Sequence, residues 1–214
     1  MISHEHKFIF IHLRRTGGNS IENALGGIRL YDRSGKETRN WDDTLHRGPS
    51  QYKENYRGHY LHDDAMKVRD LFPEEFKTYL KFSIVRNPWA QCLSLFFRLN
   101  KGNTDPQAFR DFIQNALAVK GTVPHYSIFD EDGKCLVDYI GRFETIDEDF
   151  AHICRKLGLT GIRLPHHNRS LSTDYRRFYD AETAQRVSEI YAEDIKRFGY
   201  AFDAPEGIGP GSMQ

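Results

Sequence analysis

The sequence predicts an α/β fold, with a central, mostly parallel β-sheet and helices on both of its faces. Two runs of apolar, strand-favouring residues, Phe8-Ile9-Phe10-Ile11 and Tyr79 to Val85, have the composition of buried parallel strands. Each run leads into a segment with helical periodicity. Strands that alternate with helices in this way indicate a parallel sheet that helices cover on both sides.

The 214 residues are enough for one α/β domain, which we place at residues 1–204. We expect the Gly/Pro-rich tail, residues 205–214, to be flexible. With 30 basic and 30 acidic residues the chain has no net charge to attract nucleic acid, so an anion site must be local. The three scattered cysteines favour free thiols over a disulfide or zinc site. Neither a signal peptide nor an apolar run of roughly 18 to 20 residues is evident, so we expect a cytoplasmic protein without a transmembrane segment.

The first helix begins after a basic turn, where Asn19 or Ser20 would cap it. The polar segment from Asp32 to Arg57 has no periodicity, and it is either a binding loop or a partly ordered connection. Asp63 or Asp64 would begin a second helix, which ends before a proline.

Later elements follow from capping residues and periodicity. Asn87 as N-cap, with Pro88 in the first helical position, begins a helix directly after the second strand. The remaining predicted elements are a helix around residues 109–117, a strand within residues 136–143, a helix from a Thr145/Glu148 capping box to Gly158, and a long helix over residues 181–198.

The turn after the first strand, Arg14-Arg15-Thr16-Gly17-Gly18, has the features of an anion site. Free N–H groups at a helix N-terminus attract anions, glycines let the backbone approach closely, and the arginines add full charges. It is not the nucleoside-triphosphate P-loop, because no lysine follows the second glycine. The alternative is an ordinary strand-to-helix connection with two solvated arginines.

The second strand-to-helix junction repeats this arrangement. Arg86 follows the strand at the edge where open α/β sheets bind ligands. Ser94 lies seven residues after Asn87 and therefore on the same helical face. Arg86 and Ser94 could close on one anion, or Arg86 could simply pair with a carboxylate.

Together the two junctions resemble those of the carbohydrate-type sulfotransferases that use 3′-phosphoadenosine-5′-phosphosulfate (PAPS), here of the family-2, bacterial-like kind. The family's first loop, close to FxHIPKTGGTS, stands here as FIHLRRTGGNS at residues 10–20. Its second element, close to FVRNPWxRxxS, stands as IVRNPWAQCLS at residues 84–94. The resemblance extends over residues 8–203. It implies a P-loop-like three-layer sandwich, PAPS as donor with adenosine 3′,5′-bisphosphate as product, and no metal.

The resemblance also implies which residues bind the donor. The first loop would hold the 5′-phosphosulfate, with Arg15 in place of the usual lysine, and the second element would hold the 3′-phosphate. The expected donor-binding residues are Arg14, Arg15, Thr16, Gly17, Gly18, Asn19, Ser20, Arg86, Ser94, Arg169 and Ser170. Three departures put the loop's stiffness and one positive charge in doubt: Arg14 replaces proline, Asn19 replaces threonine, and Gln91 replaces arginine.

An acceptor hydroxyl needs a general base, and histidine suits this task near neutral pH. Relatives place a histidine just before a helix cap, as His62 stands here, and His59 fits a variant of that pattern. His62 is slightly favoured, and the role stays open between the two. Glu144 is an alternative base, although we expect it to pair with Arg142. His12 is expected to pack beneath the first loop or orient it.

The leading hypothesis is therefore a PAPS-dependent sulfotransferase, in which Arg15 stabilises the leaving group and a histidine activates a hydroxyl. We expect the acceptor to be a glycan or glycolipid, to which aromatic residues in the Asp32 to Arg57 segment would contribute. The rivals are a P-loop-like kinase or nucleotide phosphotransferase, and a non-catalytic nucleotide-binding module. The sequence identifies neither the acceptor nor the oligomeric state.

Overall fold

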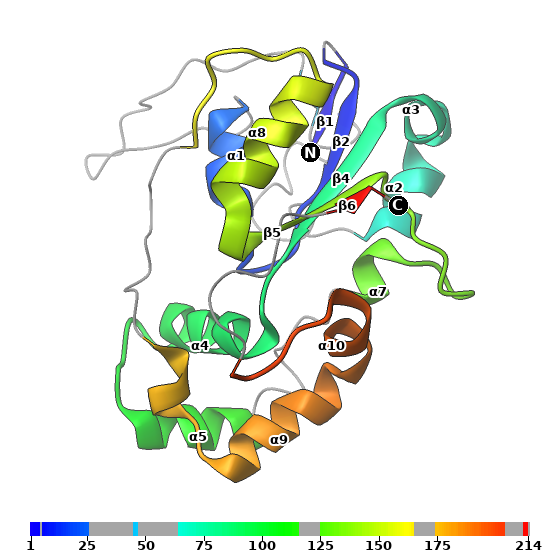
Figure 1. Cartoon of the computed structure of the whole chain (residues 1–214). Coiled ribbons are helices and arrows are strands. Elements are labelled where there is room, and N and C mark those ends of the chain that lie inside the picture. Colours follow the sequence, from blue (N-terminus) through cyan, green and yellow to red (C-terminus); the bar gives the residue numbers. More distant parts are fainter. Residues whose placement is uncertain are drawn as a thin grey trace.

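The computed structural model describes residues 1–4, 6–25, 64–115, 127–164 and 174–203, with backbone alone at 45–46, 125–126 and 212–213 (Figure 1). Its sheet has the strand order β3-β1-β2-β4-β5-β6. The strands are β1 (Ile2–Ser3), β2 (Phe8–Ile11), β3 (Leu45–His46), β4 (Leu80–Val85), β5 (Tyr139–Arg142) and β6 (Ser212–Met213).

The sheet is mixed, so the prediction of a mostly parallel sheet was correct only for its centre. β2 pairs with β4 and β4 pairs with β5 in parallel. The outer pairings of β1 with β2, β1 with β3, and β5 with β6 are antiparallel. The three outer strands have two residues each, which is too short for an apolar pattern to reveal them.

Helices occupy the connections and the C-terminal region. The α-helices are α1 (Gly18–Ala24), α2 (Ala65–Leu71), α3 (Pro73–Thr78), α4 (Pro88–Leu99), α5 (Pro106–Asn115), α7 (His125–Ile128), α8 (Ile146–Lys156), α9 (Ala181–Ile190) and α10 (Ala192–Phe198). Two short 3₁₀-helices are η3 (Phe143–Thr145) and η4 (Tyr175–Phe178). None of the helices in the described ranges is long and apolar enough to cross a lipid bilayer.

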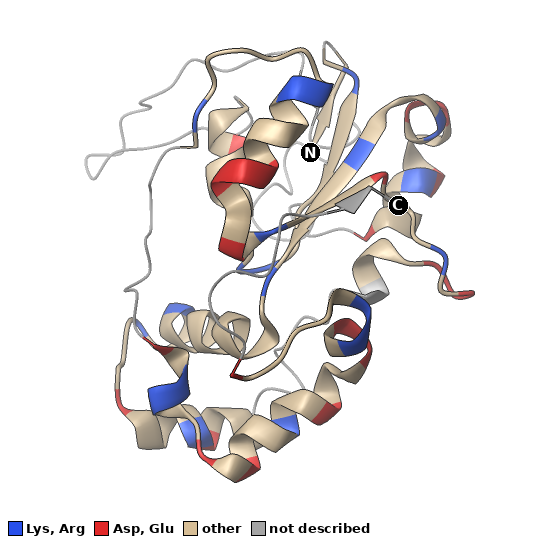
Figure 2. Ribbon diagram, viewed as in Figure 1, with Lys and Arg blue, Asp and Glu red and all other residues tan. Residues whose placement is uncertain are grey.

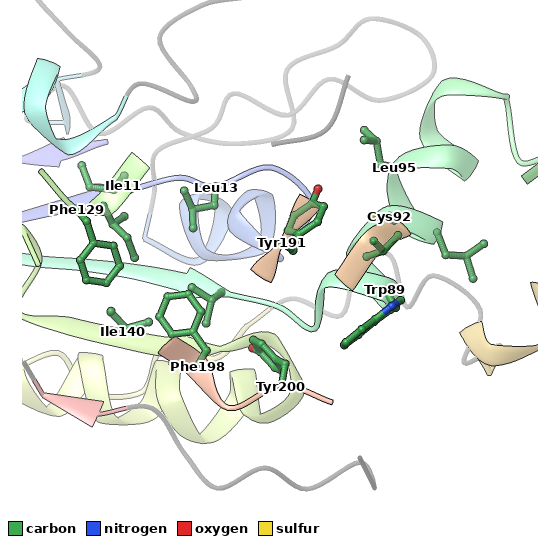
Figure 3. Packing of buried hydrophobic residues seen from close by; sticks show 14 of the residues in the cluster. Ile11, Leu13, Trp89, Cys92, Leu95, Phe129, Ile140, Tyr191, Phe198 and Tyr200 are labelled. Carbon is green, nitrogen blue, oxygen red and sulfur yellow. The ribbon is translucent and has the colours of Figure 1, made fainter. Parts of the chain in front are cut away.

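Both faces of the sheet are buried, because alternate residues of each central strand point to opposite sides. Phe8 and Phe10 of β2 belong to a cluster that includes residues of α1 and α8. Ile9 and Ile11 belong to a larger cluster with residues of α4, α5, α9 and α10. Figure 3 shows part of the larger cluster, to which Ile11 of β2, Cys92 of α4 and Phe198 of α10 contribute. The strands are apolar without alternation because both faces need apolar side chains.

Three local predictions were wrong. Helix α1 begins two residues earlier than a cap at Asn19 would place it, because its N-cap is Gly17 in the left-handed conformation rather than Asn19 or Ser20. The Thr145/Glu148 capping box does not form, since the Thr145 hydroxyl donates to the Asp149 carboxylate at 2.8 Å. The last helix is divided at Tyr191, which has a non-helical backbone at φ −106° and ψ 21°.

Other local predictions were confirmed. Asp64 caps α2 by accepting a hydrogen bond from Lys67 N at 2.8 Å. The Asn87 side chain caps α4 by accepting from the backbone N–H groups of Trp89 and Ala90. This cap fixes the start of α4 directly after β4. It therefore sets the position of Arg86, at the end of β4, relative to Ser94 in α4.

Candidate functional site

The candidate site lies where the three parallel strands end. The loop after β2 carries the basic turn, β4 is followed by Arg86, and β5 is followed by Phe143 and Glu144. The carboxyl ends of parallel strands share one edge of the sheet, so their loops meet there. The parallel pairing of β2, β4 and β5 therefore brings together residues that are far apart in sequence.

The loop after β2 turns sharply before α1. Arg15 has φ 63° and Gly17 has φ 85°, and the first value is uncommon for a residue with a side chain. The Thr16 hydroxyl donates to Leu13 O at 2.9 Å, and Gly17 O accepts from Ser20 N at 2.9 Å. These bonds hold the turn in place, so the strained backbone at Arg15 fixes the direction of its side chain.

His12 packs beneath this loop, as predicted. Its ring is buried, stacks on Phe10, and bonds through Nδ1 to Glu22 Oε1 at 3.1 Å. A Cβ atom added to Gly18 would lie only 2.1 Å from His12 Cδ2. The second glycine of the turn is therefore required by the close approach of α1 to the histidine ring.

The two basic junctions form one site. Arg15 Nε donates to Ser94 Oγ of α4 at 3.0 Å, and Arg86 Nη1 donates to the carbonyl oxygen of Arg15 at 3.1 Å. Gln91, one turn before Ser94, donates through Nε2 to Arg14 O at 2.7 Å. The hydroxyl of Ser94 thus contacts Arg15 and not Arg86, whose guanidinium lies over the Phe143 ring at 4.0 Å.

The site brings two arginine charges close together. Burial lowers the pKa of Arg86 to about 10, the Glu144 carboxylate opposes that shift, and Arg15 adds to it. Burial and the nearby charge of Arg98 lower the pKa of Arg15. Neither Arg15 nor Arg86 forms an ion pair with any residue that the structure describes, and Arg86 Nε is buried without a hydrogen-bond partner there. Guanidinium groups that form no ion pair are suited to binding an anion.

Comparison with known proteins agrees with this arrangement. A model of the sulfotransferase family matches residues 1–201. The chain belongs to the sulfotransferase family. Over 104 residues it is also 30% identical to an uncharacterized protein of Archaeoglobus fulgidus, and the match covers 48% of this chain and 87% of that protein. The mixed α/β sheet described above is consistent with the fold of this family.

In this member of the family, Glu144 has a structural position. Its Oε1 accepts from Asn87 N at 2.7 Å and its Oε2 accepts from Tyr200 OH at 3.2 Å. The predicted ion pair with Arg142 is absent from the described structure, where Arg142 Nη2 donates to Phe198 O at 2.8 Å. Because both Glu144 oxygens already accept hydrogen bonds, this carboxylate is poorly placed to take a proton from an acceptor hydroxyl.

Several predicted site residues can be placed. Arg14 and Asn19 are exposed at the first loop, Thr16 is buried with its hydroxyl bonded to the backbone, and Ser20 is half-buried in α1. His59, His62, Arg169, Ser170 and the segment from Asp32 to Arg57 lie outside the described residues. The tail at 205–214 also lies outside, apart from the backbone of 212–213.

Two contributions to the site were not predicted from the sequence. Phe143 supplies the ring beneath the Arg86 guanidinium, although it looked like the end of a strand. Arg98 acts electrostatically on Arg15 from the last turn of α4. Helical periodicity could have identified Arg98, because it stands four residues after Ser94 and shares its helix face.

Proposed function

We propose that this sulfotransferase transfers the sulfuryl group of PAPS to an acceptor hydroxyl by in-line displacement. The observation that carries the proposal is the 3.0 Å contact from Arg15 Nε to Ser94 Oγ, which joins the two motifs expected to bind the two ends of the donor. The guanidinium groups of Arg15 and Arg86 form no ion pair within the described part of the chain, which fits an anionic nucleotide, as does the buried Arg86 Nε that has no partner there. The covered faces of the sheet support the P-loop-like three-layer arrangement implied by the resemblance.

The bond that breaks joins the sulfuryl sulfur of PAPS to an oxygen of its 5′-phosphate, and the two electrons of this bond remain on the departing 5′-phosphate. A new bond forms from the acceptor oxygen to sulfur, and the acceptor proton goes to a base. Arg15, held by its strained backbone and by Ser94, would stabilise the charge that develops on the leaving oxygen. Arg86 and Ser94 would hold the 3′-phosphate, with Arg169 and Ser170 contributing from the late loop.

For the general base we propose His62, with His59 as the alternative. Replacing His62 with alanine should reduce sulfuryl transfer by about 10²- to 10⁴-fold while leaving the affinity for adenosine 3′,5′-bisphosphate unchanged, because the base contacts only the acceptor. Transfer rates and calorimetric affinities of the His62→Ala and His59→Ala variants would be measured side by side. Normal turnover without His62, together with loss in the His59 variant, would reassign the role.

For the acceptor we propose a glycan or glycolipid hydroxyl. The Asp32 to Arg57 segment contains Trp41, Tyr52 and Tyr56, and aromatic rings of this kind present flat apolar faces to sugar rings. A panel of glycans, assayed with PAPS, would identify the acceptor.

A thermal-shift experiment tests the proposed donor. Adenosine 3′,5′-bisphosphate at 100 times its Kd should stabilise the protein by about 2.7 kcal/mol. For a chain of this length that corresponds to a rise in Tm of roughly 5 to 10 °C. ATP with magnesium, which lacks the 3′-phosphate, should give a much smaller rise. Stabilisation by ATP with magnesium and none by the bisphosphate would reject the proposal in favour of a kinase or nucleotide phosphotransferase.

A further inference from the structure

One face of α4 runs along the first loop, and its contacts continue beyond the two motifs. Gln91 bonds to Arg14 O and Ser94 bonds to Arg15 Nε. Arg98 follows Ser94 by four residues and Gln91 by seven, so all three lie on one side of the helix. Arg98 is the single charged residue of α4, whose sequence is PWAQCLSLFFRL, and Figure 2 shows a basic position near one end of an otherwise uncharged helix.

The position of Arg98 on α4 lets its charge act near Arg15. Long side chains on an α-helix lean toward its N-terminus and cover the residue four positions earlier, which is Ser94 here. The charge of Arg98 accordingly acts on Arg15 and lowers its pKa. Arg98 is exposed and makes no hydrogen bond or ion pair with the described part of the chain. A second positive charge is therefore near Arg15, and neither guanidinium forms an ion pair among the residues described.

A second observation also fits an anion at this place. Arg86, which donates through Nη1 to Arg15 O of the same loop, has a buried Nε donor without a hydrogen-bond partner among the described residues. Buried N–H donors are normally paired, so this donor beside cations that form no ion pair fits an anionic acceptor. A helix C-terminus explains a single exposed arginine, but not this buried donor.

We propose that Arg98 is a third cation of the donor site, near Arg15, and that it binds the 3′-phosphate of the nucleotide together with Ser94. This inference rests on the proposed function. Arg98 would supply the positive charge that the second motif lacks at Gln91, from seven residues further along the same helix face. Because Arg98 is exposed, it can contact the anion without the desolvation cost that a second buried arginine beside Arg86 would bring.

The test compares the affinity for adenosine 3′,5′-bisphosphate, measured by calorimetry, among four forms of the full chain. Arg98→Gln should weaken binding by about tenfold, since one charge-assisted contact is lost. Arg98→Lys should stay within about threefold of the wild type because it keeps the charge. Lys101→Gln removes the same charge from an exposed residue three positions further on and should have little effect. The Tm of each unliganded variant should equal that of the wild type.

Two results would overturn the inference while leaving the proposed donor intact. The first is wild-type affinity in Arg98→Gln. The second is a weaker affinity that Arg98→Lys does not restore and that accompanies a lower unliganded Tm, because this would make Arg98 a structural residue. Failure of the wild-type protein to bind the bisphosphate would instead reject the proposed function itself, so the two failures are distinguishable.

Discussion

Replacing Arg15 with glutamine is expected to lower kcat for sulfuryl transfer by about 10²- to 10³-fold, the loss found when one preorganised donor to a developing anion is removed. The Arg15 guanidinium is held by Ser94 Oγ at 3.0 Å and by a left-handed backbone, so it does not need to reorganise during the reaction. The effect should fall on kcat more than on KM, because the leaving oxygen gains charge only in the transition state.

Two variants separate this role from general electrostatics. Arg15→Lys keeps the positive charge in the form that the family usually has, and should retain most of the activity. Arg14→Gln removes the same charge from the neighbouring residue, whose side chain is exposed, and should cost less than tenfold. Equal losses in the Arg14 and Arg15 variants would show that only the net charge of the loop matters.

The central strands and the caps could be predicted because each depends on a few neighbouring residues. β2 and β4 were evident as apolar runs, since both of their faces are covered. Asn87 and Asp64 were recognised as caps because capping bonds are local. Strand β1 was missed because two residues carry no periodicity.

Two other errors share a physical cause, which is that a tertiary contact overrode a local preference. Thr145 could have capped α8, but the buried Asp149 carboxylate takes its hydroxyl and also accepts from Arg142 N at 2.8 Å. Glu144 was expected to pair with Arg142, yet it accepts from the start of α4 and from Tyr200. A sequence shows which groups are available, and only the fold decides between their partners.

The candidate site shows the same division. The residue types of both motifs indicated an anion site, and the structure places them within one group of contacts. The particular pairing of Arg15 with Ser94 joins residues 79 positions apart, so no periodicity could predict it. It follows from the parallel register of β2 with β4, which sets the first loop against α4.

Replacing Gly18 with alanine is expected to destabilise the protein by about 2 to 4 kcal/mol. Helix propensity alone predicts the opposite sign, because alanine is favoured over glycine in a helix by about 1 kcal/mol. The new Cβ would lie 2.1 Å from His12 Cδ2 and 2.2 Å from Nε2, so the ring would have to move. Overpacking of this kind costs about 1 to 3 kcal/mol. Displacing the ring would also weaken its buried bond to Glu22, for about 1 to 3 kcal/mol more.

A double-mutant cycle with His12→Ala, followed by urea unfolding, identifies the cause. Once the ring is absent, Gly18→Ala should cost less than about 1 kcal/mol, so the two substitutions should be strongly non-additive. Asn19→Ala, at the next and exposed position of α1, is the matched control and should change the free energy of unfolding by less than about 0.5 kcal/mol. If Gly18→Ala were stabilising, or equally costly with and without His12, the close packing of α1 on His12 would not be the reason for this glycine. The second glycine of the loop would then have to be explained by its contact with a bound anion alone.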